Sequence, residues 1–380
     1  RSSDLDPNAG AGPVDELPPG DPAPEEPAPE EPPPVEPPQP FVADWYVDAA
    51  SDAGTADGSL ANPFVAIEDA VAVATSGQTV AIAGGTYNPT ATIQLTAAVS
   101  LSGSWDSGFL EQTFNPAPTT TVRSTAPVAL DVNPDIAETL DRSTVLEGLD
   151  VETDQSGTSR AALDIRGAAA PTVRNSRFVT PNGGWAVWVR NTADPRIEDS
   201  YMLGMLDVDY SPARGIYVQE TASIELVRNT AIGGLAPSNT GRGIGLDHQS
   251  GGSVLLVNNT FWSGTIDVSD GISYGASIVP GADNSSVTAY GNVFAGAIVG
   301  TSGSTIYAVN AQSTNTNVDM TFVNNTVFTG DVGSATVDTI GLGVQADDLV
   351  LINNLFARGA DDAIGNPQYL IRFNPPSGTT

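Results

Sequence analysis

A group of charged and aromatic residues near the middle of the chain has the types that bind or process sugar polymers. The group is Asp164, Arg166, Trp188, Arg190, Tyr217, Asp247 and His248. Sugar rings stack on aromatic side chains, arginines hold carboxylates, and an acid beside a histidine can transfer protons. The sequence therefore predicts a candidate glycan-binding face at these residues. A network of surface ion pairs would use the same residue types, and this second interpretation stays open.

The rest of the composition limits the chemistry that these residues could perform. The chain has no cysteine and a single histidine, which excludes thiolate catalysis, disulfides and metal sites built from several histidines or cysteines. Hydrolysis by two carboxylates needs none of these groups and is still allowed. We assign no catalytic residue from the sequence.

One acidic loop is a weak candidate for a metal site. The segment DAASDAGTADGS spaces Asp48, Asp52 and Asp57 between glycines, so their oxygens could surround Ca²⁺. The spacing differs from that of an EF-hand, and a polar hairpin-like loop explains it equally well. Calcium at this loop is the only cofactor that the sequence suggests.

The charge of the chain restricts its partners. Its 14 basic residues, all arginine, face 45 acidic ones, which gives a formal net charge of −31. Such a chain repels phosphate backbones and anionic lipids, so we expect no nucleic-acid partner and no direct membrane binding. No apolar run reaches the length of a membrane span, which is about 18 residues. The sequence begins at Arg1, and we expect any export leader to lie outside it.

Residues 1–43 have the composition of a stalk or linker. Residues 13–40 consist mostly of proline, glutamate, aspartate and alanine, and they contain the repeat PAPEEPAPEEP. Proline fixes φ and like charges repel, so such a segment stays extended or disordered and cannot form a core. We expect a spacer, either tethering the folded part to a surface or serving as a leader with no partner.

A folded region begins at Asp44, and residues 44–120 are expected to form its N-terminal cap and first coils. Five apolar residues, Phe64, Ile67, Ala70, Val71 and Ala74, recur at helical spacing and predict a short amphipathic helix that ends before Gly77. Short strand-like segments separated by turns follow this helix.

Residues 121–380 repeat one short phrase, an apolar strand followed by an asparagine and another strand. Aligning the copies places these residues in register: Gly148, Asn175, Asp199, Asn229, Asn259, Asn292, Asn325 and Asn354. The spacing between copies varies from 24 to 33 residues, which indicates a solenoid. Each repeat contains short strands with apolar residues in alternation, so the predicted fold is an all-β right-handed parallel β-helix.

The repeated asparagines have a structural explanation in such a fold. Asparagine tolerates the backbone angles of a tight corner, and its amide can bond to the asparagines of the coils above and below. We therefore predict an asparagine ladder at Asn175, Asn229, Asn259, Asn292, Asn325 and Asn354, with Gly148 and Asp199 as substitutes at the same corner.

The first coil resembles that of the pectin-lyase-like β-helix proteins, especially their secreted bacterial surface members. The motifs are Tyr46-Val47, Asn62-Pro63-Phe64, Gly77-Gln78-Thr79-Val80 and Gly85-Thr86-Tyr87. The resemblance covers residues 44 to about 370 at the level of fold. It implies that the helix closes the end of the solenoid, where open strand edges invite aggregation. It also implies a range of roles, from polysaccharide lyases and hydrolases to adhesins and structural surface proteins.

These observations favour an extracellular or surface-tethered rod with a structural or adhesive role. Such a rod would present its side to glycan, or associate with copies of itself into a filament. The alternative is a polysaccharide-active enzyme that uses the candidate glycan-binding face. The two differ in one feature, because the enzyme requires carboxyl groups about 5 to 10 Å apart beside that face.

Overall fold

The structure is a computed structural model, and it describes most of the chain from Phe41 to Phe373. The described residues are 41–373 apart from 52–53, 55, 115–116, 134–139, 156–159, 205–212, 237–242, 267–271, 282–284, 300–304, 314–317, 333–337, 346–347 and 359–367. The predicted proline-rich stalk covers residues 1–43, of which residues 1–40 lie outside the described residues. Residues 39–380 form one compact unit. The predicted division of this unit into residues 44–120 and 121–380 stays a prediction.

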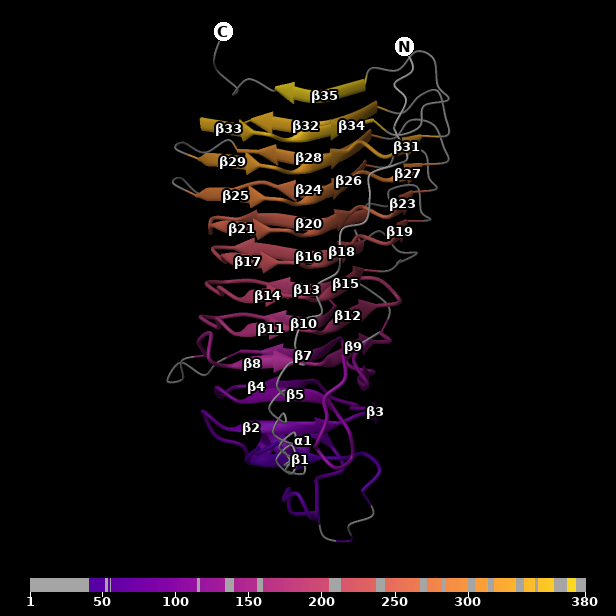
Figure 1. Cartoon of the computed structure of the whole chain (residues 1–380), viewed down its shortest axis with the longest axis vertical. Helices are drawn as coiled ribbons and strands as arrows, with labels where there is room; N and C mark the ends of the chain where they lie inside the picture. Colours follow the sequence, from indigo (N-terminus) through magenta and orange to yellow (C-terminus); the bar gives the residue numbers. More distant parts are fainter. Residues whose placement is uncertain are drawn as a thin grey trace, which may run out of the picture. The chain divides into compact units, whose positions relative to one another are not determined.

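Short parallel strands stack along the length of the unit in three long sheets (Figure 1). Sheet A runs β1 (Trp45–Val47), β2 (Thr79–Ala83), β5 (Ser100–Trp105), β8 (Val145–Glu147), β11 (Thr172–Arg174), β14 (Arg196–Glu198), β17 (Ile224–Val227), β21 (Val254–Val257), β25 (Ser286–Tyr290), β29 (Asp319–Val323) and β33 (Asp348–Ile352). Sheet B runs β3 (Gly85–Tyr87), β6 (Thr120–Ser124), β9 (Leu149–Thr153), β12 (Arg177–Thr180), β15 (Tyr201–Gly204), β18 (Thr230–Ile232), β22 (Thr260–Trp262), β26 (Val293–Ala295), β30 (Thr326–Phe328) and β34 (Leu355–Ala357).

A third long sheet and one short sheet complete the coils. Sheet C runs β4 (Ile93–Leu95), β7 (Val128–Val132), β10 (Ala161–Ile165), β13 (Trp185–Val189), β16 (Ala213–Glu220), β20 (Gly243–Ser250), β24 (Ile272–Ile278), β28 (Thr305–Gln312), β32 (Asp338–Gln345) and β35 (Gln368–Phe373). Sheet D has four strands, β19 (Leu235–Ala236), β23 (Thr265–Ile266), β27 (Ile298–Val299) and β31 (Asp331–Val332).

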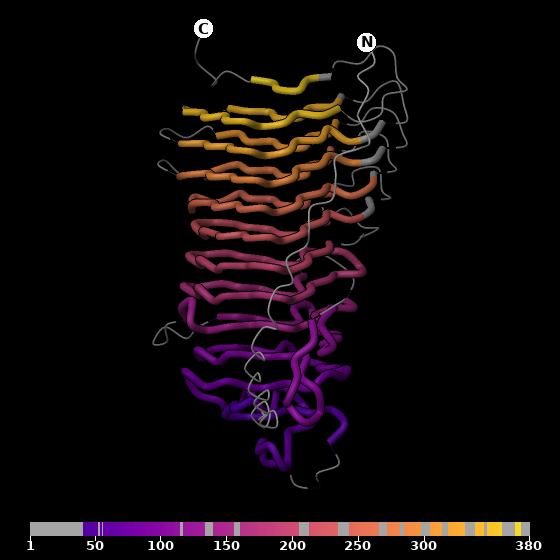
Figure 2. Tube along the Cα trace, in the orientation of Figure 1, coloured from indigo at the N-terminus to yellow at the C-terminus, as the bar shows by residue number. Residues whose placement is uncertain are grey.

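The chain visits the sheets in rotation, so neighbouring strands of each sheet come from successive coils (Figure 2). Parallel neighbours require such crossover connections, and these connections are right-handed in proteins. The predicted right-handed parallel β-helix is therefore confirmed.

Columns of inward apolar side chains fill the solenoid. In sheet A, Val173, Ile197, Leu226 and Leu256 occupy one register position in four successive coils, and all four are fully buried. Phe261 and Phe294 also come from successive coils, and their rings stack 5.4 Å apart. Each coil thus buries its apolar side mainly against its neighbours, as a solenoid requires.

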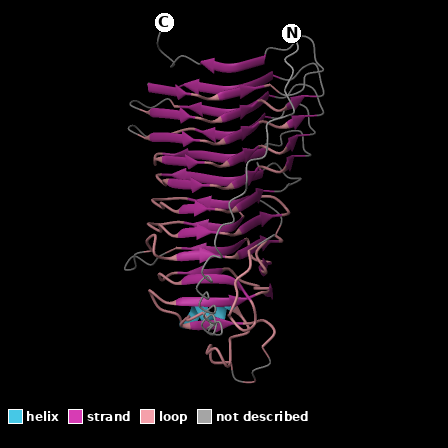
Figure 3. Cartoon of the chain, in the orientation of Figure 1, coloured by secondary structure: helices cyan, strands magenta, loops and turns pink. Residues whose placement is uncertain are grey.

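The single helix among the described residues, α1 (Ile67–Val73), covers the core beside the first strands (Figure 3). Ile67 and Ala70 are buried, and Phe64, Val71 and Ala74 pack against the core from partly exposed positions. The apolar face that the helical spacing predicts is therefore the face of α1 that packs on the core and closes the end of the solenoid beside the first strands. No helix in the described part of the chain is long and apolar enough to cross a membrane.

Five of the predicted asparagines form one continuous ladder between sheets A and B. The side-chain amides of Asn229, Asn259, Asn292 and Asn325 each donate to the Oδ1 of the next asparagine at 3.0 to 3.1 Å, ending at Asn354. Each of these amides also donates to a backbone carbonyl of sheet A. The ladder therefore satisfies polar groups that would otherwise be buried without partners.

The predicted register of the first three corners is wrong by one residue. Asn175, Asp199 and Gly148 have positive φ and precede the ladder position, so Asn175 does not belong to the ladder. In its coil the ladder position is Ser176, and Ser200 follows it in the next coil. Ser200 Oγ accepts from the Ser176 amide, and the Ser200 amide donates to Asn229 Oδ1 at 3.0 Å. Aligning the copies on the buried apolar residue of sheet A gives this register, because that residue lies three positions before the ladder.

Candidate functional site

Sheet C brings most of the predicted face into one column. Asp164, Trp188, Tyr217 and Asp247 are register partners in four successive strands, β10, β13, β16 and β20. Asp131 of β7 occupies the same position one coil earlier. Stacked parallel strands are about 4.8 Å apart, so these side chains lie in adjacent coils on one side of the sheet.

The two arginines of the predicted face hold the two aspartates at the start of the column. Arg166 Nε donates to Asp131 Oδ1 at 2.9 Å. Arg190 makes two parallel bonds to Asp164, from Nε at 3.2 Å and from Nη2 at 2.8 Å. Asp164 is only 1% exposed, and burial raises its pKa against the opposing effect of Arg190. These are buried charge-assisted pairs, and the aspartates keep little surface for a ligand.

The aromatic residues pack against the arginines. The Arg190 guanidinium lies 4.0 Å from the ring centroid of Trp188, and the Arg214 guanidinium lies 3.9 Å from that of Tyr217. Trp185 joins the two groups, with centroids 4.4 Å from Trp188 and 5.0 Å from Tyr217. Cation–π contacts of this kind occupy the ring faces on which a sugar would stack.

Two glutamines connect the aromatic residues to the last acid of the column. The Trp188 indole donates to Gln219 Oε1 at 2.9 Å, and the Gln219 amide donates to the Tyr217 hydroxyl. Burial raises the pKa of Tyr217. Asp247 is fully buried and accepts from Arg214 Nε at 2.5 Å and from the Gln249 amide. The predicted face is thus one network from Asp131 to Gln249.

His248 does not belong to this face. It is a register partner of Val218 and Ile278, which are core residues, and its side chain is fully buried. Alternate residues of a strand point to opposite sides, so a histidine next to the outward Asp247 must point inward. Neither of its ring nitrogens has a hydrogen-bond partner among the described residues, and burial lowers its pKa to about 3. His248 is therefore a neutral core residue at neutral pH.

The network also contains residues that were not predicted from the sequence, among them Asp131, Trp185 and Arg214. Asp131 had a usable signal, because VALDV (128–132) matches AALDI (161–165) position by position. Arg214 and Trp185 are also register partners, although they lie three residues before Tyr217 and Trp188. Under a strict two-residue alternation, residues three apart on a strand point to opposite sides of the sheet. The pattern therefore does not predict that Trp185 joins the same cluster as Trp188, or that Arg214 joins the same cluster as Tyr217.

The predicted calcium loop contains no cluster of metal ligands in its described part. Asp48 Oδ1 accepts from the Ala50 amide at 2.8 Å, and Asp57 Oδ1 accepts from the Ser59 amide at 2.9 Å. Asp52 lies outside the described residues. Both described carboxylates close their own turns, and no group of three or more metal-ligating side chains occurs among the described residues. Among the described residues of this loop, the carboxylates of Asp48 and Asp57 bind backbone amides and do not form the oxygen cage that Ca²⁺ requires.

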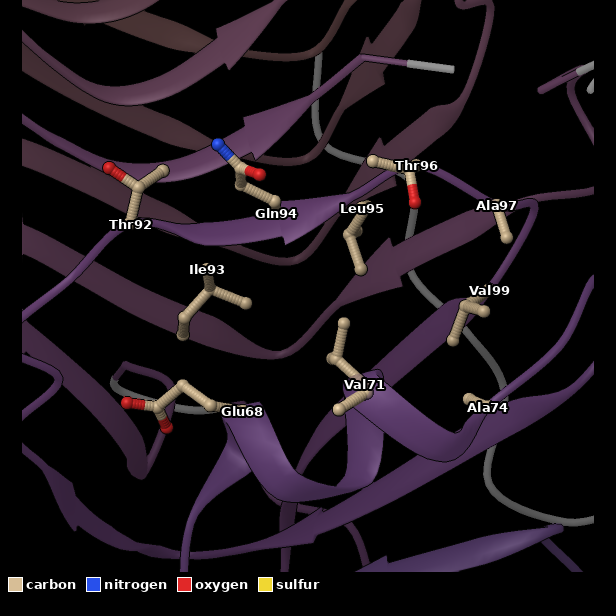
Figure 4. Close-up of a pocket in the computed structure, with 11 residues that line it drawn as sticks. Glu68, Val71, Ala74, Thr92, Ile93, Gln94, Leu95, Thr96, Ala97 and Val99 are labelled. Carbon is tan, nitrogen blue, oxygen red and sulfur yellow. The ribbon is translucent and has the colours of Figure 1, made fainter. Parts of the chain in front are cut away.

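Among the described residues, the hollows that lie outside the network include one beside α1 and two along sheet B. A cavity of about 370 Å³ between α1 and β4 is lined mainly by aliphatic and threonine side chains, with Glu68 at its edge (Figure 4). It has one acid and no base among its lining residues, so it offers no catalytic pair. The other two, of about 560 and 220 Å³, adjoin along sheet B and share Tyr201.

No family model matches the chain, and no curated protein matches it. Several solved structures resemble it. A pectin methylesterase from Aspergillus niger is 12% identical, with a TM-score of 0.36 over 90% of this chain and 89% of the other. The pectate lyase Pel9A is 13% identical, with a TM-score of 0.37 over 85% and 79%. The Streptococcus pneumoniae surface protein and adhesin PfbA is 11% identical, with a TM-score of 0.29 over 85% and 98%.

At these identities and TM-scores, the likenesses assign no activity to the chain. The strand pairing of the described residues between 41 and 373 itself identifies the chain as a right-handed parallel β-helix, the fold that its sequence predicts.

Proposed function

We propose that this chain is an extracellular or cell-surface β-helical rod with a structural or adhesive role, which presents a lateral face to glycan without degrading it. One observation carries the proposal. The charged and aromatic side chains of the predicted glycan-binding face on sheet C bind one another from Asp131 to Gln249.

Catalysis at sheet C would require this network to open. A catalytic carboxylate must reach a glycosidic bond or a water molecule, yet Asp164 and Asp247 are at most 1% exposed and both are held by arginines. Removing one partner of a buried ion pair costs about 3–5 kcal/mol. Such a face is suited to holding successive coils in register.

Self-association is a second way in which a rod could serve a structural role. Among the described residues, the last strands expose several apolar side chains, namely Val350, Ile352, Leu355, Tyr369, Leu370 and Phe373. At the other end, α1 covers the first coils. Exposed apolar side chains on strand edges favour pairing with another chain.

Co-sedimentation with insoluble polysaccharides and mass photometry test the proposal together. An adhesive rod is retained by at least one polysaccharide, and a self-associating rod forms oligomers that disappear when Leu355 and Phe373 are replaced by serine. Val42→Ser is the control, because Val42 is also exposed but precedes the first strand. A chain that stays monomeric and binds no polysaccharide contradicts the proposal.

A polysaccharide-active enzyme is the second candidate, and a specific observation favours it. Asp131 and Asp164 both contact Arg166, the latter at 3.9 Å, so two carboxylates do converge on this face. Burial also raises the pKa of Asp164, as in carboxyls that act as general acids. If the chain is an enzyme of this kind, it releases soluble sugars from a polysaccharide and Asp164→Asn abolishes the release.

A further inference from the structure

The outer surface of sheet B carries an aromatic side chain in every second coil. Tyr201 lies on β15, Trp262 on β22 and Phe328 on β30, and all three are partly exposed. Trp262 and Phe328 occupy the same register column, with Ala295 between them. Two coils span about 9.6 Å, which is on the scale of two sugar units in an extended chain.

Tyr201 and Trp262 line one apolar groove of about 220 Å³. Leu203 and Ile232 form its floor between the two aromatic residues, because Leu203, Ile232 and Trp262 are register partners in successive coils. The side chain of Thr265, at the start of β23, adds a hydroxyl at the edge. Aromatic and aliphatic side chains with a few hydrogen-bonding groups at the rim form the usual lining of a small-molecule site.

The glycine turns that follow β18 and β22 shape one wall of this groove. Gly234 and Gly264 both have positive φ, and both line the groove. A Cβ added to Gly264 would lie 1.9 Å from the carbonyl oxygen of Gly234. Only glycines allow this close stacking, which turns the chain from sheet B into sheet D beside Trp262.

The groove continues past Tyr201 into the wider hollow of about 560 Å³. Phe114 and Pro118 line this hollow opposite Ser200 and Thr230. Phe114 packs over Gly148, since a Cβ there would lie 2.6 Å from its ring. The two hollows therefore supply apolar surface and hydroxyl groups on both sides of Tyr201.

The charges around the groove favour a neutral ligand. No charged residue is found among the described residues that line the part containing Trp262. In the wider part, Arg228 is paired with Asp199 by two bonds, at 2.7 and 2.6 Å. Arg177 is paired with Asp150 and Glu152. Neither arginine is left to neutralise an acidic sugar, and the strongly negative chain would repel one.

We infer that a neutral oligosaccharide lies in this groove, along the solenoid axis, with its sugar rings stacked on Tyr201 and Trp262. The inference rests on the proposed adhesive function and names its ligand class and its face. The site lies on sheet B, whereas the sequence had predicted a glycan-binding face at residues that belong to sheet C.

Isothermal titration of the full chain with hexasaccharides tests the inference. The neutral probes are cellohexaose, laminarihexaose and mannohexaose, and hexagalacturonate is the acidic probe. Trp262→Ala and Tyr201→Ala are the test variants. Trp188→Ala is the matched control, because it removes a partly exposed tryptophan from sheet C. Melting temperatures establish that every variant is folded.

The inference predicts binding of at least one neutral probe, about tenfold or more weaker in both test variants and unchanged in Trp188→Ala. The tryptophan fluorescence change on binding should also disappear in Trp262→Phe.

Three outcomes would overturn the inference. They are loss of binding only in Trp188→Ala, binding of hexagalacturonate alone, and no binding of any probe. The first two would leave the proposed adhesive function standing, and the third would leave it to the co-sedimentation and mass photometry tests.

Discussion

At the scale of single residues, the corner between sheets A and B separates two roles of asparagine. Asn175, Asn258, Asn324 and Asn353 have positive φ and turn the chain. The residue that follows each turn is buried, or partly buried at Asn354, and bonds to the neighbouring coils, as Asn259 does. Arg228 and Asp199 also occupy the turn position, so the turn tolerates other side chains. From Ser176 to Asn325, every side chain at the ladder position both donates and accepts, so this stretch of the ladder is more restrictive than the turn.

Asn292→Ala tests the ladder at its middle. Asn292 accepts from both the backbone and the side chain of Asn259, and it donates to Leu256 and Asn325. Its loss leaves several buried groups without partners, so we expect about 2–4 kcal/mol of destabilisation in chemical unfolding. Val293→Ala, at the neighbouring exposed position, should cost less than about 0.5 kcal/mol. Equal losses in the two variants would show that the ladder does not contribute to stability.

His248 should make the fold sensitive to mild acid. Its pKa is about 3 in the folded chain and about 6.5 in the unfolded chain. Above pH 6.5 neither state is protonated there, so the full stability is present. As the pH falls below 6.5, only the unfolded state binds the proton, and stability falls by about 1.4 kcal/mol per pH unit.

The comparison of wild type with His248→Leu between pH 7 and pH 5 isolates this effect. Carboxylates titrate in both proteins, so the difference between their stabilities reports on the histidine. We expect the wild type to lose about 2 kcal/mol more than the variant over this range, measured by urea unfolding at each pH. If the wild type and His248→Leu lose the same stability between pH 7 and pH 5, His248 instead lies in a solvated or hydrogen-bonded environment.

At the scale of elements, sheet C depends on pairs of opposite charge between successive coils. Asp164→Asn removes the charge of a buried acid that Arg190 holds by two bonds, and we expect a loss of about 3–5 kcal/mol. Asp199→Asn is the matched control, because Asp199 pairs with Arg228 in the same manner but at the exposed surface. Its loss should be below about 1 kcal/mol. Similar thermal unfolding of the two variants would contradict a structural role for the sheet C network.

The turn from sheet B into sheet D offers a second test at this scale. Gly264→Ala places a methyl group against the carbonyl of Gly234, whereas Gly77→Ala meets no atom within 4 Å. Both glycines have positive φ, so the backbone strain of about 1–2 kcal/mol is common to the two variants. We expect Gly264→Ala to lose at least about 2 kcal/mol more than Gly77→Ala in thermal unfolding. An equal loss would mean that the stacked glycines have room to separate.

At the scale of the whole molecule, the repeated phrase was sufficient to predict the solenoid and the corner from Asn229 onward, and helical spacing was sufficient to predict α1. These features depend on periodicity and on apolar spacing, both of which are local properties of the sequence. The face on sheet C was only partly predictable, because the identity of a surface residue does not show which neighbour it binds. Trp188 and Arg190 appeared as separate ligand-binding groups, and the structure pairs them with each other.

The groove on sheet B was not predictable from the same pattern. Tyr201, Trp262 and Phe328 lie 61 and 66 residues apart, and only the coil register brings them to one side. The variable length of the repeats hides this register. The predicted corners at Asn259 and Asn325 already placed Trp262 and Phe328 in one column. The corner predicted at Asp199, which is wrong by one residue, misplaced Tyr201 relative to them.

The most direct test of a non-catalytic rod measures binding and product in the same sample. The chain is incubated with insoluble polysaccharides over days, and both the bound protein and the soluble sugars are quantified by mass spectrometry. A rod whose sheet C face is closed by its own ion pairs should be retained on at least one polysaccharide and release no more sugar than a heat-denatured control. Release that grows with time and disappears in Asp164→Asn would show instead that sheet C is an active site.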